Sequence, residues 1–226
     1  MFIIVDYRIH RDSIKVLEKY GEIILFKTEN ITYSSISCHP DIFIFQNHQH
    51  FVVAPNIPEK YIQFFEKNNI QFEFGHSLVG NFFPKTTFYN AAAGFGNLIY
   101  NPKTIDSLVL KQCEALNKIT VKQGYTRCNT MIVNEEIVIT SNHEIAKKSK
   151  KGIYFPPEKI VLEGINHGFI GGCLGLFENK LFVNGSLKHF CSIDSIESEL
   201  NNANIEIIEL NNYDLQDVGS ILMVGK

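Results

Sequence analysis

Two cysteines and one histidine are the residues of this chain best suited to chemistry. A thiolate attacks electron-poor carbon and an imidazole transfers protons near neutral pH, so the candidate catalytic residues are His167, Cys128 and Cys173. Glycines crowd the sequence around His167, which indicates a backbone that bends sharply or approaches another group closely. The structural alternatives are an imidazole that caps a carbonyl at a turn, and free cysteines that are small buried apolar residues.

A second set of polar residues could bind a ligand without reacting with it. Carboxylates such as Asp41 and Asp217 match a cationic ligand. His39 and Asp41 flank Pro40, which restricts the local backbone, so a role in a turn is the alternative for this pair. With His167, the following residues are predicted to line one central polar pocket: His39, Asp41, Asn90, Gln123, Tyr125 and Asp217.

Composition excludes several classes of partner. The net charge of −3 gives no electrostatic reason to expect nucleic acid, and no stretch has the roughly 18 apolar residues that span a bilayer. The five cysteines are scattered and odd in number, which fits neither a disulfide framework nor a zinc site. We therefore expect no cofactor, no metal, no nucleic acid and no membrane, and a reducing cytoplasm as the location. The partner that remains is a small polar molecule.

The elements that must position these residues follow one plan: two short apolar strands, then a helix. The first copy has strands at 41–45 and 51–54 and a helix at 59–68 with an aromatic and aliphatic face. In the next copy, a strand at 97–100 leads into a helix at 104–117, for which Thr104 is the expected N-cap.

Two later stretches, 123–141 and 167–185, align without a gap at an offset of 44 residues. In this alignment Gly124 meets Gly168, and the apolar run 137–139 meets 181–183. A helix is expected after each stretch, beginning near Asn142 and near Ser192 or Asp194. Repetition at this period predicts supersecondary units that bury their apolar faces against one another.

Counting weaker copies, units begin near five positions: His39, Asn90, Gln123, His167 and Asp217. The last unit is cut short by the end of the chain, and the N-terminal segment 2–20 could complete it. The segment Met1–Arg8 is too short and too soon charged for a signal peptide and is expected to be the first strand. The sequence thus predicts a single α/β domain over 1–226 with a pseudo-fivefold, ring-like arrangement.

This arrangement resembles the pentein fold, also called the guanidine-modifying enzyme fold, an α/β propeller of five strand-hairpin-helix units. The residues that carry the resemblance are the motifs at 123–128, 166–173 and 217–222. The superfamily includes arginine deiminase, dimethylarginine dimethylaminohydrolase, the amidinotransferases and the non-enzymatic ribosomal anti-association factor six. The chain is most similar to an uncharacterised bacterial family of this fold.

The resemblance implies a catalytic pattern that this chain matches only in part. Enzymes of the superfamily use a Cys nucleophile on the last unit, a His on the fourth and an acidic residue on the third. His167 matches the histidine, but Phe169 stands where an acidic residue commonly follows it, and Gln123 occupies the carboxylate position. The nucleophile position falls at about Leu222, and no cysteine follows Cys191. The usual covalent mechanism therefore cannot run.

Three functions stay open at this point. The first is a pentein relative that binds a small polar metabolite with an amidine or guanidine group, without the standard thiol. The second is an active hydrolase or amidinotransferase, acting on C–N bonds of guanidino or amidino compounds with Cys128, Cys173 or a water activated by His167. The third is a non-catalytic interaction module.

Overall fold

The structure is a computed structural model that describes residues 1–48, 50–189 and 193–225. Its strands form five three-stranded sheets, and in each sheet the middle strand is antiparallel to one neighbour and parallel to the other. The sheets are β15 (Leu222–Val224), β1 (Phe2–Asp6) and β2 (Glu22–Phe26); β3 (Ile44–Asn47), β4 (His50–Val53) and β5 (Phe72–Phe74); β6 (Ala92–Gly94), β7 (Asn97–Tyr100) and β8 (Asn117–Thr120); β9 (Thr130–Ile132), β10 (Ile137–Thr140) and β11 (Lys151–Tyr154); and β12 (Leu174–Phe177), β13 (Lys180–Val183) and β14 (Glu206–Glu209).

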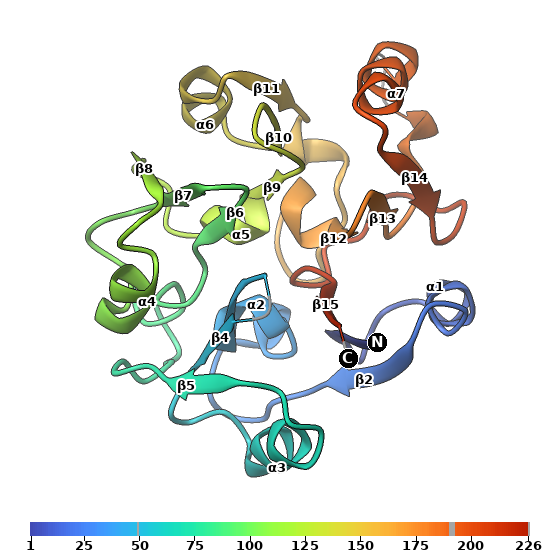
Figure 1. The fold of residues 1–226 in the computed structure, drawn as a ribbon. Coiled ribbons are helices and arrows are strands. Elements are labelled where there is room, and N and C mark those ends of the chain that lie inside the picture. Colours follow the sequence, from blue (N-terminus) through green and yellow to red (C-terminus); the bar gives the residue numbers. More distant parts are fainter. Residues whose placement is uncertain (49, 190–192, 226) are drawn as a thin grey trace.

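A helix connects the middle strand of each sheet to the parallel strand, as a parallel crossover requires. These connecting helices are α1 (Arg11–Leu17), α3 (Glu59–Lys67), α4 (Ser107–Gln112), α6 (His143–Lys148) and α7 (Ile193–Asn202). Figure 1 shows all five at the outside of the molecule, with the sheets distributed around its middle. The described residues thus form an α/β fold of small sheets.

Shorter helical turns precede the first strands of three sheets and lie nearer the middle. They are α2 (Pro40–Phe43), α5 (Thr126–Asn129) and the 3₁₀ turn η3 (Ile170–Cys173). Further 3₁₀ turns are η1 (Ser34–Ile36), η2 (Pro157–Lys159) and η4 (Leu187–His189). Each of the three inner turns ends where an apolar strand begins, so the turn residues are carried to the inner end of a sheet.

The two ends of the chain share a sheet. Strand β15 pairs antiparallel with β1, placing Phe2 opposite Val224, and the N and C labels of Figure 1 lie side by side. The expected completion of the last unit by the N-terminal strand is confirmed by this register. All five residues of β1 are buried, as the apolar run at the start of the sequence requires.

Apolar faces of the outer helices pack onto the sheets and form the core. Helix α3 buries Tyr61, Ile62 and Phe65, the face expected from its helical spacing. Phe65 is fully buried within the largest apolar cluster, so its truncation to alanine would cost about 3–5 kcal/mol of stability.

Two expected elements differ from those observed. The segment 41–45 begins as helix α2 and becomes strand only at Ile44, because Pro40 occupies the first turn, where its fixed φ favours a helix. The helix expected at 104–117 spans only Ser107–Gln112, and its N-cap is Asp106, whose carboxylate accepts from Leu108 N, so Thr104 was the wrong cap. Asn117 begins strand β8 and pairs with Asn97.

The 44-residue offset is reproduced by the positions of the elements. Turns α5 and η3 begin at Thr126 and Ile170, and strands β9 and β12 begin at Thr130 and Leu174. Asn142 caps helix α6 as expected, with its side chain accepting from Ile145 N. Helix α7 begins at Ile193, between the two expected starts, Ser192 and Asp194. Ser192 itself lies outside the described residues, as does Cys191.

Candidate functional site

The segments before the first strands carry six polar side chains into contact in the interior. We call this set the central polar cluster, and each member is at most 3% exposed: His39, Asp41, Asn90, Cys128, Asp217 and Ser220. Its residues come from four different units, so only the arrangement of the sheets brings them together. Buried polar groups are costly unless they bind one another or a ligand.

Asp41 is the acceptor at one side of the cluster. Its Oδ2 accepts from Cys128 Sγ at 3.0 Å and from Ser220 Oγ at 2.7 Å. The side chain of Asn90 donates to the carbonyl of Asp41 at 3.2 Å, and its Oδ1 accepts from the backbone N–H of Cys128 at 3.1 Å. Asn90 thereby holds the turn that carries Cys128 against the turn that carries Asp41.

His39 lies between two carboxylates on the other side. Its Nδ1 is 3.9 Å from Asp217 Oδ1, and its Nε2 is 3.9 Å from Asp6 Oδ2. Within the part of the chain that the structure describes, neither ring nitrogen has a hydrogen-bond partner, and Asp41 Oδ1 has none either, although all three atoms are buried. Since buried polar atoms are normally hydrogen-bonded, these three mark a place where a further group would bind.

Asp217 is held by backbone donors from a glycine-rich segment. Its Oδ2 accepts from Phe169 N at 2.9 Å and its Oδ1 from Gly219 N at 3.0 Å. A Cβ at Gly172 would overlap the Asp217 carboxylate, and one at Gly168 would crowd its Cβ. Two of the glycines near His167, Gly168 and Gly172, therefore make room for Asp217.

Burial dominates the protonation of the cluster. It lowers the pKa of His39 to about 3, so the imidazole is neutral, and it raises the pKa of Asp217 to about 7, with a further rise from the nearby charge of Asp41. Burial also raises the pKa of Asp41. It raises the pKa of the Cys128 thiol well above its ordinary value, as does the charge of Asp41.

Asp6 and Arg8 support the cluster from the end of β1. The guanidinium of Arg8 binds the Asp6 carboxylate through Nε at 2.9 Å and through Nη2. Its remaining donors reach the carbonyls of Ser34 and Ser35, so Asp6 is fixed beside His39. Sequence reasoning missed both residues and Ser220. The available signals were a charged pair ending an apolar strand, and the place of Ser220 within the motif 217–222.

Four predicted site residues make no side-chain hydrogen bond to the cluster within the described part of the chain. His167 is half-buried, and its Nδ1 lies 3.1 Å from the carbonyl of Gly168. Gln123 accepts from Tyr125 N, a local turn contact, and the Tyr125 hydroxyl lies 2.6 Å from that of Thr86. Cys173 is fully buried, with its thiol near the carbonyl of Phe169.

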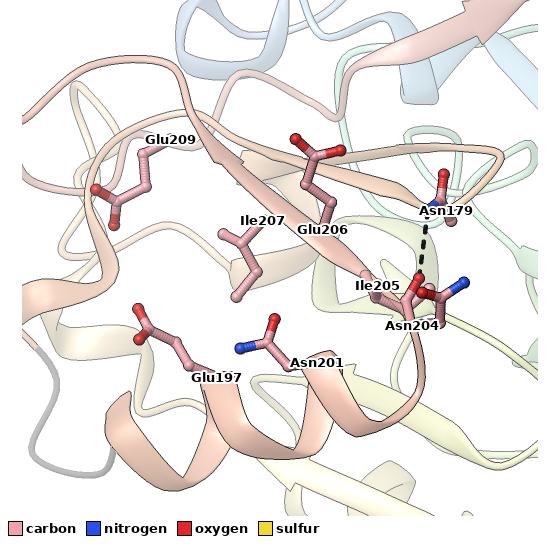
Figure 2. A pocket seen from close by; sticks show the side chains of 8 residues that line it. All are labelled: Asn179, Glu197, Asn201, Asn204, Ile205, Glu206, Ile207 and Glu209. Atoms are coloured by element: carbon pink, nitrogen blue, oxygen red, sulfur yellow. Dashed lines mark hydrogen bonds between the residues drawn. The ribbon is translucent and has the colours of Figure 1, made fainter.

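The hollow beside the cluster is small. Among the described residues, Asp6 and Asp217 border a space of only about 10 Å³, because surrounding segments close over the side chains. A larger groove of about 690 Å³ lies at the periphery between α7 and β14 (Figure 2). Its walls carry Glu197, Glu206 and Glu209 with asparagines, a set without a nucleophile or an imidazole.

Comparison with solved structures identifies the fold. The C. jejuni agmatine deiminase is 10% identical and aligns over 93% of this chain and 86% of its own with a TM-score of 0.57. SxtG, an amidinotransferase from Microseira wollei in the saxitoxin biosynthetic pathway, is 8% identical and aligns over 92% and 87% with a TM-score of 0.54. At these identities the likeness is one of fold, and the fold is that of the pentein superfamily.

The family follows from the sequence itself. A family model described as a family of unknown function (DUF6873) matches residues 4–222, and the chain belongs to that family. No curated protein matches the sequence. Among the described residues, no helix is both long enough and apolar enough to cross a bilayer.

Proposed function

We propose that the central polar cluster binds a small polar metabolite carrying a guanidino or amidino group, without the thiol mechanism of the last unit. The observation that carries the proposal is the orphaned, buried Oδ1 of Asp41 beside a second buried carboxylate, Asp217. A guanidinium has five donors in a planar fork, which suits two carboxylates approaching from different units. The neutral imidazole of His39 can accept a further donor.

The residues of the last unit support the part of the proposal that excludes the usual thiol nucleophile. Leu222 and Met223 are buried apolar residues of β15 whose backbones pair with Ile4 and Ile3. The thiol that the enzymes place in this unit has no counterpart there. Binding at Asp41 and Asp217 therefore does not imply turnover.

We also propose that the five sheets are blades of a pseudo-fivefold α/β propeller with the cluster near its axis. The support is that each unit has a hairpin, an outer helix and a parallel third strand, while the turns before the first strands meet in the cluster. A reducing, cytoplasmic location is proposed on the four described cysteines, which are all free thiols.

The test is calorimetric titration of the chelator-treated protein with agmatine, using butylamine as the amine that lacks a guanidino group. We expect agmatine to bind and butylamine to bind at least about tenfold more weakly, because an ammonium cannot span both carboxylates. Asp41→Asn should weaken agmatine binding, whereas Glu197→Gln, which changes an exposed carboxylate in the peripheral groove, should leave it unchanged. Equal binding of both amines, or unaltered binding in Asp41→Asn, would reject the proposal.

One observation favours a second candidate, a hydrolase or amidinotransferase that uses Cys128. Its Sγ lies 3.0 Å from Asp41 Oδ2, within reach for proton transfer. In such a reaction Asp41 accepts the thiol proton, Sγ bonds to the guanidinium carbon, and a C–N bond breaks as the protonated amine leaves. Water or another amine then displaces the thiol from the carbon.

Cys173 supplies the matched control for this second function, because it is a buried thiol in η3, the turn that corresponds to α5 in the next unit. Turnover of agmatine, with a covalent adduct detected by intact-mass spectrometry, should disappear in Cys128→Ser and persist in Cys173→Ser. If agmatine binds to saturation but neither product nor adduct forms, the catalytic function is rejected and only the binding function remains.

A further inference from the structure

Three kinds of metal-binding side chain meet at one point of the central polar cluster. A ring nitrogen of His39, the sulfur of Cys128 and a carboxylate oxygen of Asp217 all lie within 4.8 Å of one another. Neighbouring ligand atoms around a tetrahedral zinc ion are about 3.5 Å apart, given its bond lengths to nitrogen, oxygen and sulfur. Small side-chain movements would therefore bring all three atoms onto one ion.

A second observation points to a ligand at this place. His39 is 0% exposed, yet neither of its ring nitrogens has a hydrogen-bond partner among the described residues. Its Nδ1 faces Asp217 Oδ1 at 3.9 Å, so the unpartnered nitrogen is aimed at another member of the set. An imidazole buried in this way lacks the bond that a metal ion would supply.

The far side of His39 faces a carboxylate, the group that often orients a metal-bound histidine. Such histidines donate the second ring N–H to a carboxylate, which orients the ring. Here Nε2 faces Asp6 Oδ2 at 3.9 Å, and Arg8 holds Asp6 through paired donors. Asp6 and Arg8 are thus positioning residues for the imidazole.

We propose that the chain binds one Zn²⁺ ion through His39, Cys128 and Asp217, with the fourth position open. One nitrogen, one sulfur and one oxygen ligand match zinc, and three protein ligands with an open position are typical of catalytic zinc sites. On binding, the Sγ–H bond of Cys128 breaks and a Zn–S bond forms. Asp41 Oδ2, which already accepts from this thiol, takes up the released proton and passes it to solvent.

This inference does not rest on the guanidino proposal, and the two ligands would exclude each other because both use Asp217. It replaces the expectation of no metal, which was drawn from the scattered cysteines. The three ligands come from three units and are far apart in the sequence, so no short motif of metal-ligand spacing indicates the site.

The test is titration of untagged, chelator-treated protein with Zn²⁺ by calorimetry and with Co²⁺ by absorbance. We expect one ion per chain and a thiolate-to-Co²⁺ charge-transfer band that is lost in Cys128→Ser and retained in Cys173→Ser. Asp6→Asn should weaken Zn²⁺ binding by roughly 10–100-fold, the usual effect of removing an outer partner. No binding to the wild-type protein, or a thiolate band that survives in Cys128→Ser, would overturn the proposal.

A measurement on the wild-type protein covers the case in which a variant fails to fold. X-ray absorption at the zinc edge should show one sulfur and a histidine among the ligands, whereas only nitrogen and oxygen neighbours would contradict the site. Agmatine binding measured in chelator reports on the guanidino proposal separately. The zinc proposal and the guanidino proposal can therefore be rejected independently of each other.

Discussion

The sulfur of Cys128 lies 3.0 Å from Oδ2 of Asp41, although 87 positions separate the two residues in the chain. The contact joins turn α5 to turn α2, and Ser220 completes it from the segment before β15. A thiol that donates to a buried carboxylate is held in its protonated form, because a second negative charge would be costly there. This relationship determines how the cysteine should behave.

Thiol modification tests that behaviour first. The pKa of Cys128 is raised well above its ordinary value by burial and by Asp41, so little thiolate exists at pH 7. In chelator-treated protein we expect Cys128 to be alkylated at least about 100-fold more slowly than in the unfolded chain. Residue-resolved mass spectrometry measures this, with buried Cys113 and Cys173 as internal references. Rapid modification of Cys128 alone would instead indicate an activated nucleophile.

Gly172→Ala should destabilise the fold. The added Cβ would overlap the Asp217 carboxylate, which is fixed by two backbone donors and cannot move away cheaply. We expect a loss of about 1–3 kcal/mol in the free energy of unfolding measured with urea. Gly94→Ala is the matched control, because the nearest atom to its added Cβ would be the Cβ of Ile132, at 3.8 Å. Equal stability of the two variants would contradict the close approach.

The free energy of unfolding should depend on pH through Asp217. Its pKa is about 7 in the folded protein against 3.8 unfolded, so the native state binds more protons between these values. Stability from this group therefore falls as the pH rises from about 4 to 7. Asp217→Asn removes this pH dependence. As the pH rises from about 4 to 7, the free energy of unfolding of the variant should therefore increase relative to that of the wild type, by at most about 1.4 kcal/mol for each pH unit between the two pKa values.

His39 supplies the opposite slope. Its pKa is about 3 when folded against 6.5 unfolded, so the unfolded state binds more protons and stability rises with pH over that interval. His39→Gln should lose this rise, in contrast to Asp217→Asn. Urea titrations of metal-free protein from pH 4 to 7 measure both differences. Parallel curves for the two variants would count against the assigned protonation states.

Arg8→Lys should weaken the support of Asp6. A lysine provides one point charge, whereas the Arg8 guanidinium binds the Asp6 carboxylate and the carbonyls of Ser34 and Ser35 together. We expect a loss of about 1–3 kcal/mol in unfolding free energy, because these acceptors would lose their donors. Arg11→Lys changes an exposed arginine of α1 and should shift stability by less than about 0.5 kcal/mol. If Arg8→Lys leaves the unfolding free energy unchanged, the ion pair between Arg8 and Asp6 does not stabilise the fold.

Much of the fold was predictable because its signals are local. The strand at 97–100 was predicted with its observed bounds, and the 44-residue offset anticipated the matching turns and strands. Apolar periodicity over a few residues is enough to identify a strand or a helix face. The predictions failed where a single residue changed the local backbone: Pro40 started a helix, and Asp106 capped α4 in place of Thr104.

The site was predictable only in part. His39, Asp41, Asn90, Cys128 and Asp217 were named as candidates and lie in the central polar cluster, whereas His167, the expected proton carrier, lies outside it. The residue types and their places at the starts of units led to these five candidates, whose role as a binding site stays a prediction. The glycines near His167 were correctly associated with a close approach, and at Gly168 and Gly172 the approaching group is Asp217.

By itself, the sequence determined the unit plan and the pairing of the first strand with the last. Only the tertiary structure decided that His39, Cys128 and Asp217 share one buried place, that Asp6 and Arg8 support it, and that it is closed. The reason is physical: strands and helices follow from contacts between near neighbours, whereas the cluster depends on contacts across most of the chain. Burial then sets the protonation of each group, and burial exists only once the units have assembled.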